Sequence, residues 1–87
     1  MNPMLHQIET LLQAALNPTE LIVEDDSADH IGHANAGAGH YTVNITSLLF
    51  ENKSRVARHQ LVYQSLGDLM KSQIHALRIR AFAPGEV

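Results

Sequence analysis

The chain has 87 residues, of which 45% are apolar, so the composition predicts one small domain with a modest core rather than a disordered segment. The absence of cysteine excludes disulfides, a thiol nucleophile and a zinc site built from the chain's own thiolates. No apolar run reaches the roughly 18 residues of a membrane span, and the N-terminus lacks the pattern of a signal peptide. We therefore expect a soluble, cytoplasmic protein with no membrane partner.

Six elements are predicted along the chain from hydrophobic periodicity and from turn residues. They follow the order α-β-β-α-α-β, at residues 3–16, 21–23, 40–46, 53–66, 68–72 and 74–82. A loop rich in histidine and glycine, which we expect to be flexible, occupies residues 26–39. A short tail occupies residues 83–87, and Pro84-Gly85 is expected to end the ordered part of the chain. All of these elements are expected to form a single domain over residues 1–87.

Local signals set the ends of the helices. Asn2 followed by Pro3 suits the start of the first helix, and Asn17-Pro18 ends it because the residue before proline avoids the helical conformation. Asn52 is predicted to cap the second long helix, and Gly67 to end it.

Two faces are also predicted. In that helix, one face carries Val56, His59 or Gln60, Tyr63 and Leu66. In the last strand, Arg78 and Arg80 alternate with Leu77, Ile79 and Ala81.

The order of elements predicts an α+β fold with a three-stranded mixed sheet and helices packed on one face. The first two strands can pair antiparallel across the loop, and the third, after a helical crossover, can lie parallel to its neighbour. This is the order of KH-like domains of the second type. Nucleic-acid-binding KH domains carry a GxxG loop between two helices. Residues 65–68 (SLGD) stand there with one glycine and an acidic residue, so KH-type binding is not encoded.

Three passages together resemble the BolA family. They are residues 20–23 (ELIV) with Ser27, residues 55–66 (RVARHQLVYQSL), and residues 74–77 (IHAL). The second is similar to the family's R-V-x-R-H-x-x-V-Y-x-x-L signature, and the third to its H-A-L signature. Two positions depart from the pattern: Asn52 stands where glycine is common, and Gln60 where arginine is common. Asparagine also tolerates a left-handed turn, so the fold is unaffected.

The resemblance implies a non-enzymatic partner of monothiol glutaredoxins. In that family the pair holds a bridging [2Fe-2S] cluster, to which the glutaredoxin supplies a cysteine and glutathione a second thiol. The BolA-like chain adds the histidine of H-A-L, here His75, and a residue of the loop, which corresponds to His30 with His33 as runner-up. No cofactor is expected on the isolated chain, which is expected to be a monomer or a weak homodimer.

The histidines also have structural interpretations. From periodicity alone, His75 could equally be a half-buried residue that donates to a backbone carbonyl. His40, at the start of the second strand, is interpreted as structural or as flanking the site. His59 is interpreted as a helix-packing residue hydrogen-bonded across the core, and His6 as exposed helix surface.

The alternative function comes from a different class. Bacterial members of the family are described as DNA-binding regulators of the stress response and of cell morphology. The cationic candidates for such a role are Lys53, Arg55, Arg58, Lys71, Arg78 and Arg80. Charge is indeed unevenly divided, because residues 1–52 contain no lysine or arginine and seven acidic residues. The two halves could instead pack together and partly neutralise each other. No catalytic triad, phosphate loop or hydrolytic zinc motif points to an enzyme.

Overall fold

The computed structural model describes residues 3–26 and 39–86. Its elements follow the predicted α-β-β-α-α-β order, with one added 3-10 turn, η2. They are α1 (Pro3–Leu16), β1 (Glu20–Asp25), β2 (His40–Thr46), η2 (Leu48–Phe50), α2 (Arg55–Leu66), α3 (Leu69–Ser72) and β3 (Ala76–Phe82). The predicted α+β fold is confirmed. No helix in the described part of the chain is long and apolar enough to cross a membrane.

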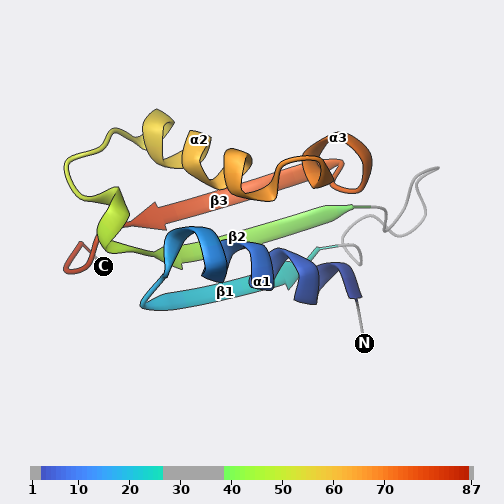
Figure 1. Cartoon of the computed structure of the whole chain (residues 1–87), viewed down its shortest axis with the longest axis horizontal. Helices are drawn as coiled ribbons and strands as arrows, with labels where there is room; N and C mark the ends of the chain where they lie inside the picture. The colour runs from blue at the N-terminus through green and yellow to red at the C-terminus, as the bar shows by residue number, and fades with distance from the viewer. Residues whose placement is uncertain (1–2, 27–38, 87) are drawn as a thin grey trace.

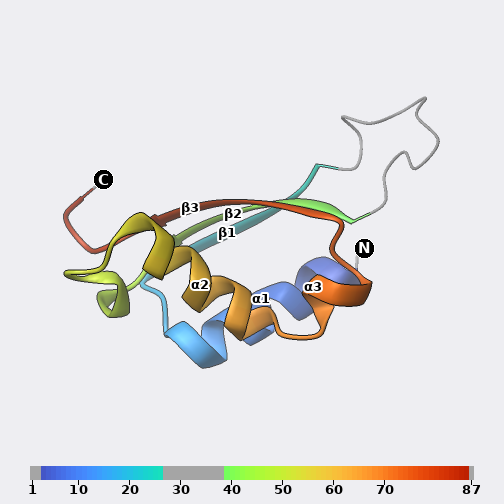
Figure 2. The same cartoon turned by 90° about the horizontal axis from the view of Figure 1, so that it is seen from above.

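The strands form one mixed sheet in the order β1-β2-β3. β1 pairs antiparallel with β2, whereas β2 pairs parallel with β3, as predicted. The helices of the described residues lie on one face of this sheet, as Figure 2 shows, and none of these helices lies on the other face. The end of β1 and the starts of β2 and β3 consequently lie together at one end of the sheet (Figure 1).

The core lies between the helices and the sheet. Val23, Val43 and Ile79 occupy one row across the three strands and are all buried. They belong to one apolar cluster with Ile8 and Leu12, which are fully buried residues of α1. Burial of each such side chain contributes about 1.5–3 kcal/mol, so the helix-facing rows hold the layers together.

The buried face of α2 differs from the prediction. Val56 and Tyr63 are 67% and 41% exposed, whereas Val62 and Leu66 are buried. The inward stripe runs in steps of four from Arg58 through Val62 to Leu66, and the side chain of Arg58 is only 12% exposed. The predicted face was right at Leu66 and wrong at Val56 and Tyr63. The inward stripe begins with a cation, so a pattern of apolar residues alone did not reveal it.

The start of α2 also differs from the prediction. Ser54 is its cap, and the Ser54 Oγ accepts a hydrogen bond of 3.1 Å from the backbone N–H of Ala57. Asn52 instead has a φ of 62°, the left-handed conformation that asparagine tolerates in the turn before the helix. The chain therefore turns at Asn52 and enters the helix three residues later.

Two further boundaries are corrected. β3 begins at Ala76 rather than at residue 74, because Ile74 donates its N–H to Leu69 and closes the turn after α3. The ordered part of the chain continues past Pro84-Gly85, where the sequence predicted its end. Glu86 donates its N–H to the Ala83 carbonyl at 3.1 Å and turns its side chain back toward α2. The predicted loop 26–39 lies mostly outside the described residues.

Candidate functional site

Two histidines meet at the end of the sheet where β2 and β3 begin. His40 is the first residue of β2, and His75 directly precedes β3. Because these strands are parallel, with His40 opposite Ala76, the two side chains lie close together. Their ring centroids are 5.3 Å apart, and the rings are tilted by 52°. His75 is exposed and His40 is half-buried.

Gly39 fixes the backbone at His75. The N–H groups of His75 and Ala76 both donate to the Gly39 carbonyl, at 2.8 and 3.0 Å. Gly39 has a φ of +65°, and a Cβ at this position would lie 2.6 Å from the Gln73 carbonyl oxygen and 2.8 Å from the His75 nitrogen. A side chain therefore does not fit here without a shift of backbone. The histidine is held at the end of the sheet by a contact that only glycine permits.

Asp26 attaches the end of β1 to the same place. Its N–H donates to the His40 carbonyl at 2.8 Å, and its carboxylate accepts a hydrogen bond from the Thr42 hydroxyl. Residues 26 and 39, which flank the intervening segment, are thereby both connected to the histidine pair. A metal-ligating residue in the segment 27–38 would therefore be attached, through residues 26 and 39, to the end of the sheet that carries His40 and His75.

The donor set in the described part of the chain is incomplete for a metal. No group of three or more histidine, cysteine, aspartate or glutamate residues is found there that could hold a metal ion. His40 and His75 together provide two imidazoles, and the predicted ligands His30 and His33 lie outside the described residues. The arrangement fits part of a site better than a whole one, because a tetrahedral metal needs four ligands.

From the sequence, His75 is predicted to be a ligand, and His40 is interpreted as structural or as flanking the site. Their proximity was missed because it depends on the parallel register of β2 and β3, which links positions far apart in the chain. His6 is exposed, as predicted. His59 is half-buried and lines a groove, and none of the described residues is its hydrogen-bond partner across the core. That interpretation of His59 is corrected.

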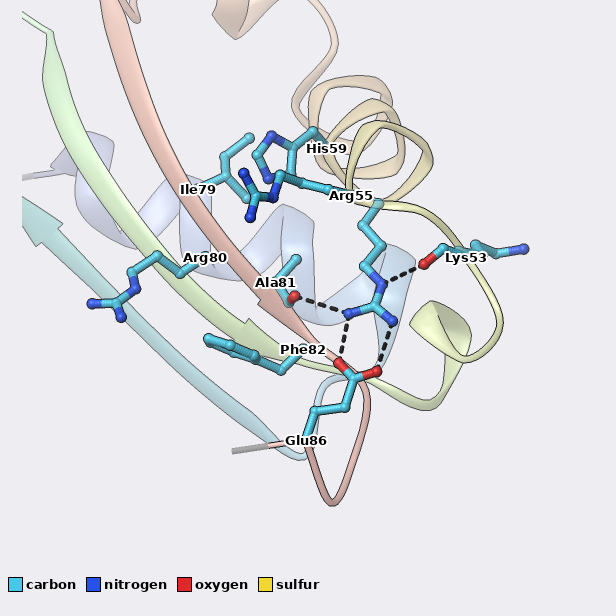
Figure 3. Close-up of a pocket in the computed structure, with 9 residues that line it drawn as sticks. Lys53, Arg55, His59, Ile79, Arg80, Ala81, Phe82 and Glu86 are labelled. Atoms are coloured by element: carbon cyan, nitrogen blue, oxygen red, sulfur yellow. Dashed lines mark hydrogen bonds and ion pairs between the residues drawn. The ribbon is translucent and has the colours of Figure 1, made fainter.

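Arg58 is engaged within the fold. Its Nε donates to the Lys53 carbonyl at 3.0 Å, and its Nη1 to the Ala81 carbonyl at 3.1 Å. Nη1 and Nη2 also donate to the two carboxylate oxygens of Glu86, at 2.6 and 2.9 Å (Figure 3). The hydrogen bonds from Arg58 and from the Ala83 N–H lower the pKa of Glu86 to about 2. Arg58 thus connects α2, β3 and the C-terminal turn.

The other five predicted cations do not form one patch. Lys53, Arg55 and Arg80 line an open groove of about 670 Å³, together with Arg58 and Glu86. Figure 3 shows the Lys53 ammonium group directed away from the groove and the Arg80 side chain on the opposite side of β3 from Arg55. Arg78 is exposed on the strand, and Lys71 lies in α3. Three of the five therefore border one groove from different sides, and the other two lie outside it.

Comparison with known proteins decides the family. The family model described as BolA-like protein matches residues 12–86. This chain belongs to the BolA family. It is 43% identical to SufE-like protein 1 of Arabidopsis thaliana over 93% of this chain and 24% of that protein. It is 38% identical to the DNA-binding transcriptional regulator BolA of Haemophilus influenzae, over 91% of this chain and 76% of that one.

The fold agrees with solved structures of the BolA family. The BolA domain of SufE1 from Arabidopsis thaliana superposes with a TM-score of 0.89 at 42% identity, covering 100% of this chain and 99% of that chain. The chain therefore corresponds to a whole BolA domain, although it spans only about a quarter of the length of the plant relative. The predicted family is confirmed.

Proposed function

We propose that this BolA chain is a non-catalytic partner of a monothiol glutaredoxin and co-ligates a bridging [2Fe-2S] cluster. His75 supplies one imidazole and His30 the other, with His33 as runner-up. The glutaredoxin supplies a cysteine, and glutathione supplies the second thiol. One observation carries the proposal: His75 is exposed, its backbone is fixed by Gly39, and it stands where residues 27–38 join the sheet.

The donor chemistry of the chain supports a shared cluster. The chain has no cysteine, so it can offer imidazoles and must take its thiolates from a partner. When bound, a cluster with two imidazoles on one iron has a higher reduction potential than one held by thiolates alone. The role of this chain is to hold its imidazole in one position while the partner brings the remaining ligands. Reduced glutathione is characteristic of the cytoplasm, where we place the complex.

The test is an anaerobic titration of the chain into a cluster-loaded monothiol glutaredoxin with glutathione, followed by visible circular dichroism. We expect a new spectrum that saturates at one-to-one stoichiometry. His75→Ala and His30→Ala should abolish it, whereas His33→Ala and the exposed control His6→Ala should retain it. An unchanged spectrum in His75→Ala would overturn the ligand assignment. A spectrum that remains that of the glutaredoxin alone would overturn the partnership.

DNA binding is the second candidate function. It is favoured by the name of the Haemophilus influenzae relative and by Lys53, Arg55 and Arg80, none of which forms an ion pair with another described residue. Acidic Glu20 and Glu24 share the open sheet face with Arg78 and Arg80, which weakens the attraction for phosphate.

The second candidate predicts salt-dependent binding of a labelled DNA duplex, measured by fluorescence anisotropy. Arg55→Ala should weaken binding and reduce the slope of log K against log salt by about 1. His75→Ala should leave binding unchanged. If no salt-dependent complex forms, the cations of this chain have no role in DNA binding.

A further inference from the structure

β3 is an edge strand of the described sheet, and its outward main-chain groups pair with no other described strand. In the described sheet its neighbour is β2, and nothing pairs with its other side. On the side of β2, the Ala76 N–H donates to the Gly39 carbonyl, and the Phe82 carbonyl accepts from the Ser47 N–H. Because main-chain groups alternate along a strand, those of Leu77, Ile79 and Ala81 point toward the open edge. Arg58 reaches the Ala81 carbonyl from that side, which agrees with this orientation.

A groove runs beside this edge. α2 lies on the helix-bearing face of the sheet (Figure 2) and is displaced beyond β3, away from β2, in the view of Figure 1. The open space of about 670 Å³ is lined by consecutive residues 79–82 of β3 and by the first part of α2. A groove between an edge strand and a flanking helix is the geometry in which extended peptides add to a sheet as a further strand. Here Ile79 provides an apolar wall and His59 a polar one.

The charges around the groove select an acidic occupant. Arg55 and Arg80 stand on the two sides of β3 (Figure 3), so an added strand would have a cation near each of its faces. Glu86 shows that the groove accepts a carboxylate, because this side chain of the C-terminal turn already lies in it on Arg58. Opposite charges on neighbouring strands stabilise pairing, and like charges oppose it.

We propose that the groove between β3 and α2 binds an extended acidic segment of a partner protein, which pairs with the free edge of β3 near Leu77 and Ile79. A polypeptide satisfies alternating N–H and C=O groups at an edge, whereas a phosphate backbone offers acceptors alone. Pairing of two β3 edges would bring arginines of two copies together. His75 is not among the residues that line the groove, and the part of β3 that lines it, residues 79–82, lies toward the opposite end of the strand from His75.

The probe is a fluorescein-labelled peptide of alternating glutamate and valine, as long as the 7 residues of β3. We expect saturable binding to the full chain in fluorescence anisotropy. A peptide with lysine in place of glutamate should not bind. The acidic peptide N-methylated at alternate residues should not bind either, because it keeps the charge and loses the edge-pairing donors. Amide exchange at Leu77 and Ile79 should slow in the complex with the unmodified peptide.

Variants locate the site. Arg55→Ala and Arg80→Ala should each weaken binding about fivefold, the loss of one partly screened ion pair. Lys71→Ala removes the same charge from an exposed position outside the groove and should change nothing. His75→Ala should also leave peptide binding unchanged, so the result is independent of the proposed cluster function.

Three outcomes would overturn the proposal. The N-methylated peptide binding as well as the unmodified one would show charge attraction without strand pairing. A DNA duplex binding at Arg55 and Arg80 while the acidic peptide fails would assign the groove to nucleic acid. Concentration-dependent association of the chain that slows amide exchange at Leu77 and Ile79 without any peptide would assign the edge to a second copy.

Discussion

The guanidinium of Arg58 holds the carboxylate of Glu86 through two hydrogen bonds, so that a helix residue closes the turn after the last strand. This ion pair connects positions 28 residues apart. It accounts for two departures from the sequence prediction, the polar start of the inward stripe of α2 and the ordered C-terminal turn.

Acid should weaken this connection. The pKa of Glu86 in the folded chain is about 2, below the ordinary value of 4.5, because Arg58 and the Ala83 N–H stabilise the carboxylate. A lowered folded-state pKa stabilises the fold above pH 4.5, and that contribution is lost as the pH falls from about 4.5 to about 2. In thermal unfolding followed by circular dichroism, Glu86→Gln should melt below the wild type at pH 7. The difference should disappear by about pH 2. A difference that is independent of pH would show that the charge of Glu86 is not responsible.

Gly39 should tolerate no side chain. Gly39→Ala should lower the free energy of unfolding by about 1–3 kcal/mol, because the new Cβ meets backbone atoms at a positive φ. Gly85→Ala is the matched control. Gly85 also has a positive φ, of +90°, but nothing lies within 4 Å of its Cβ position, so the cost should be smaller. Denaturant unfolding measures both variants. Equal costs would mean that the contact with residues 73 and 75 contributes nothing.

The inward stripe of α2 can be tested with two valines of the same helix. Val62 is fully buried and Val56 is 67% exposed. Val62→Ala should cost about 2 kcal/mol through lost burial and a residual cavity, and Val56→Ala should cost close to nothing. Denaturant midpoints of the two variants give the comparison. If Val56→Ala were the more destabilising change, the face first predicted from the sequence would be restored.

The helix cap has its own pair of variants. Ser54→Ala should destabilise the chain by about 1 kcal/mol, because the N–H of Ala57 loses its acceptor. Asn52→Gly should be neutral or slightly stabilising, since glycine adopts the φ of 62° without strain. Thermal melts of both variants provide the measurement. A larger loss in Asn52→Gly than in Ser54→Ala would make Asn52 the functional cap.

Local patterns in the sequence were enough to predict the elements, their order, the mixed three-stranded sheet and the family. These follow from local causes: helical and strand periodicity, Asn17-Pro18 as a helix stop, and motifs read within short windows. His75 could be singled out because the H-A-L motif is local as well. The position of His40 against His75 could not, because it arises from pairing between strands separated by two helices.

The charged residues that stabilise the fold could be recognised only from their contacts in three dimensions. Arg58 looks in sequence like one of six surface cations, yet in space it reaches Lys53, Ala81 and Glu86. The free edge of β3 and the groove beside it were likewise invisible, because an edge is defined by the neighbours that a strand lacks. Periodicity reports which side of an element is apolar. Periodicity does not report which other element that side contacts. The hydrogen bonds of Arg58 and the unpaired edge of β3 both depend on such contacts between elements.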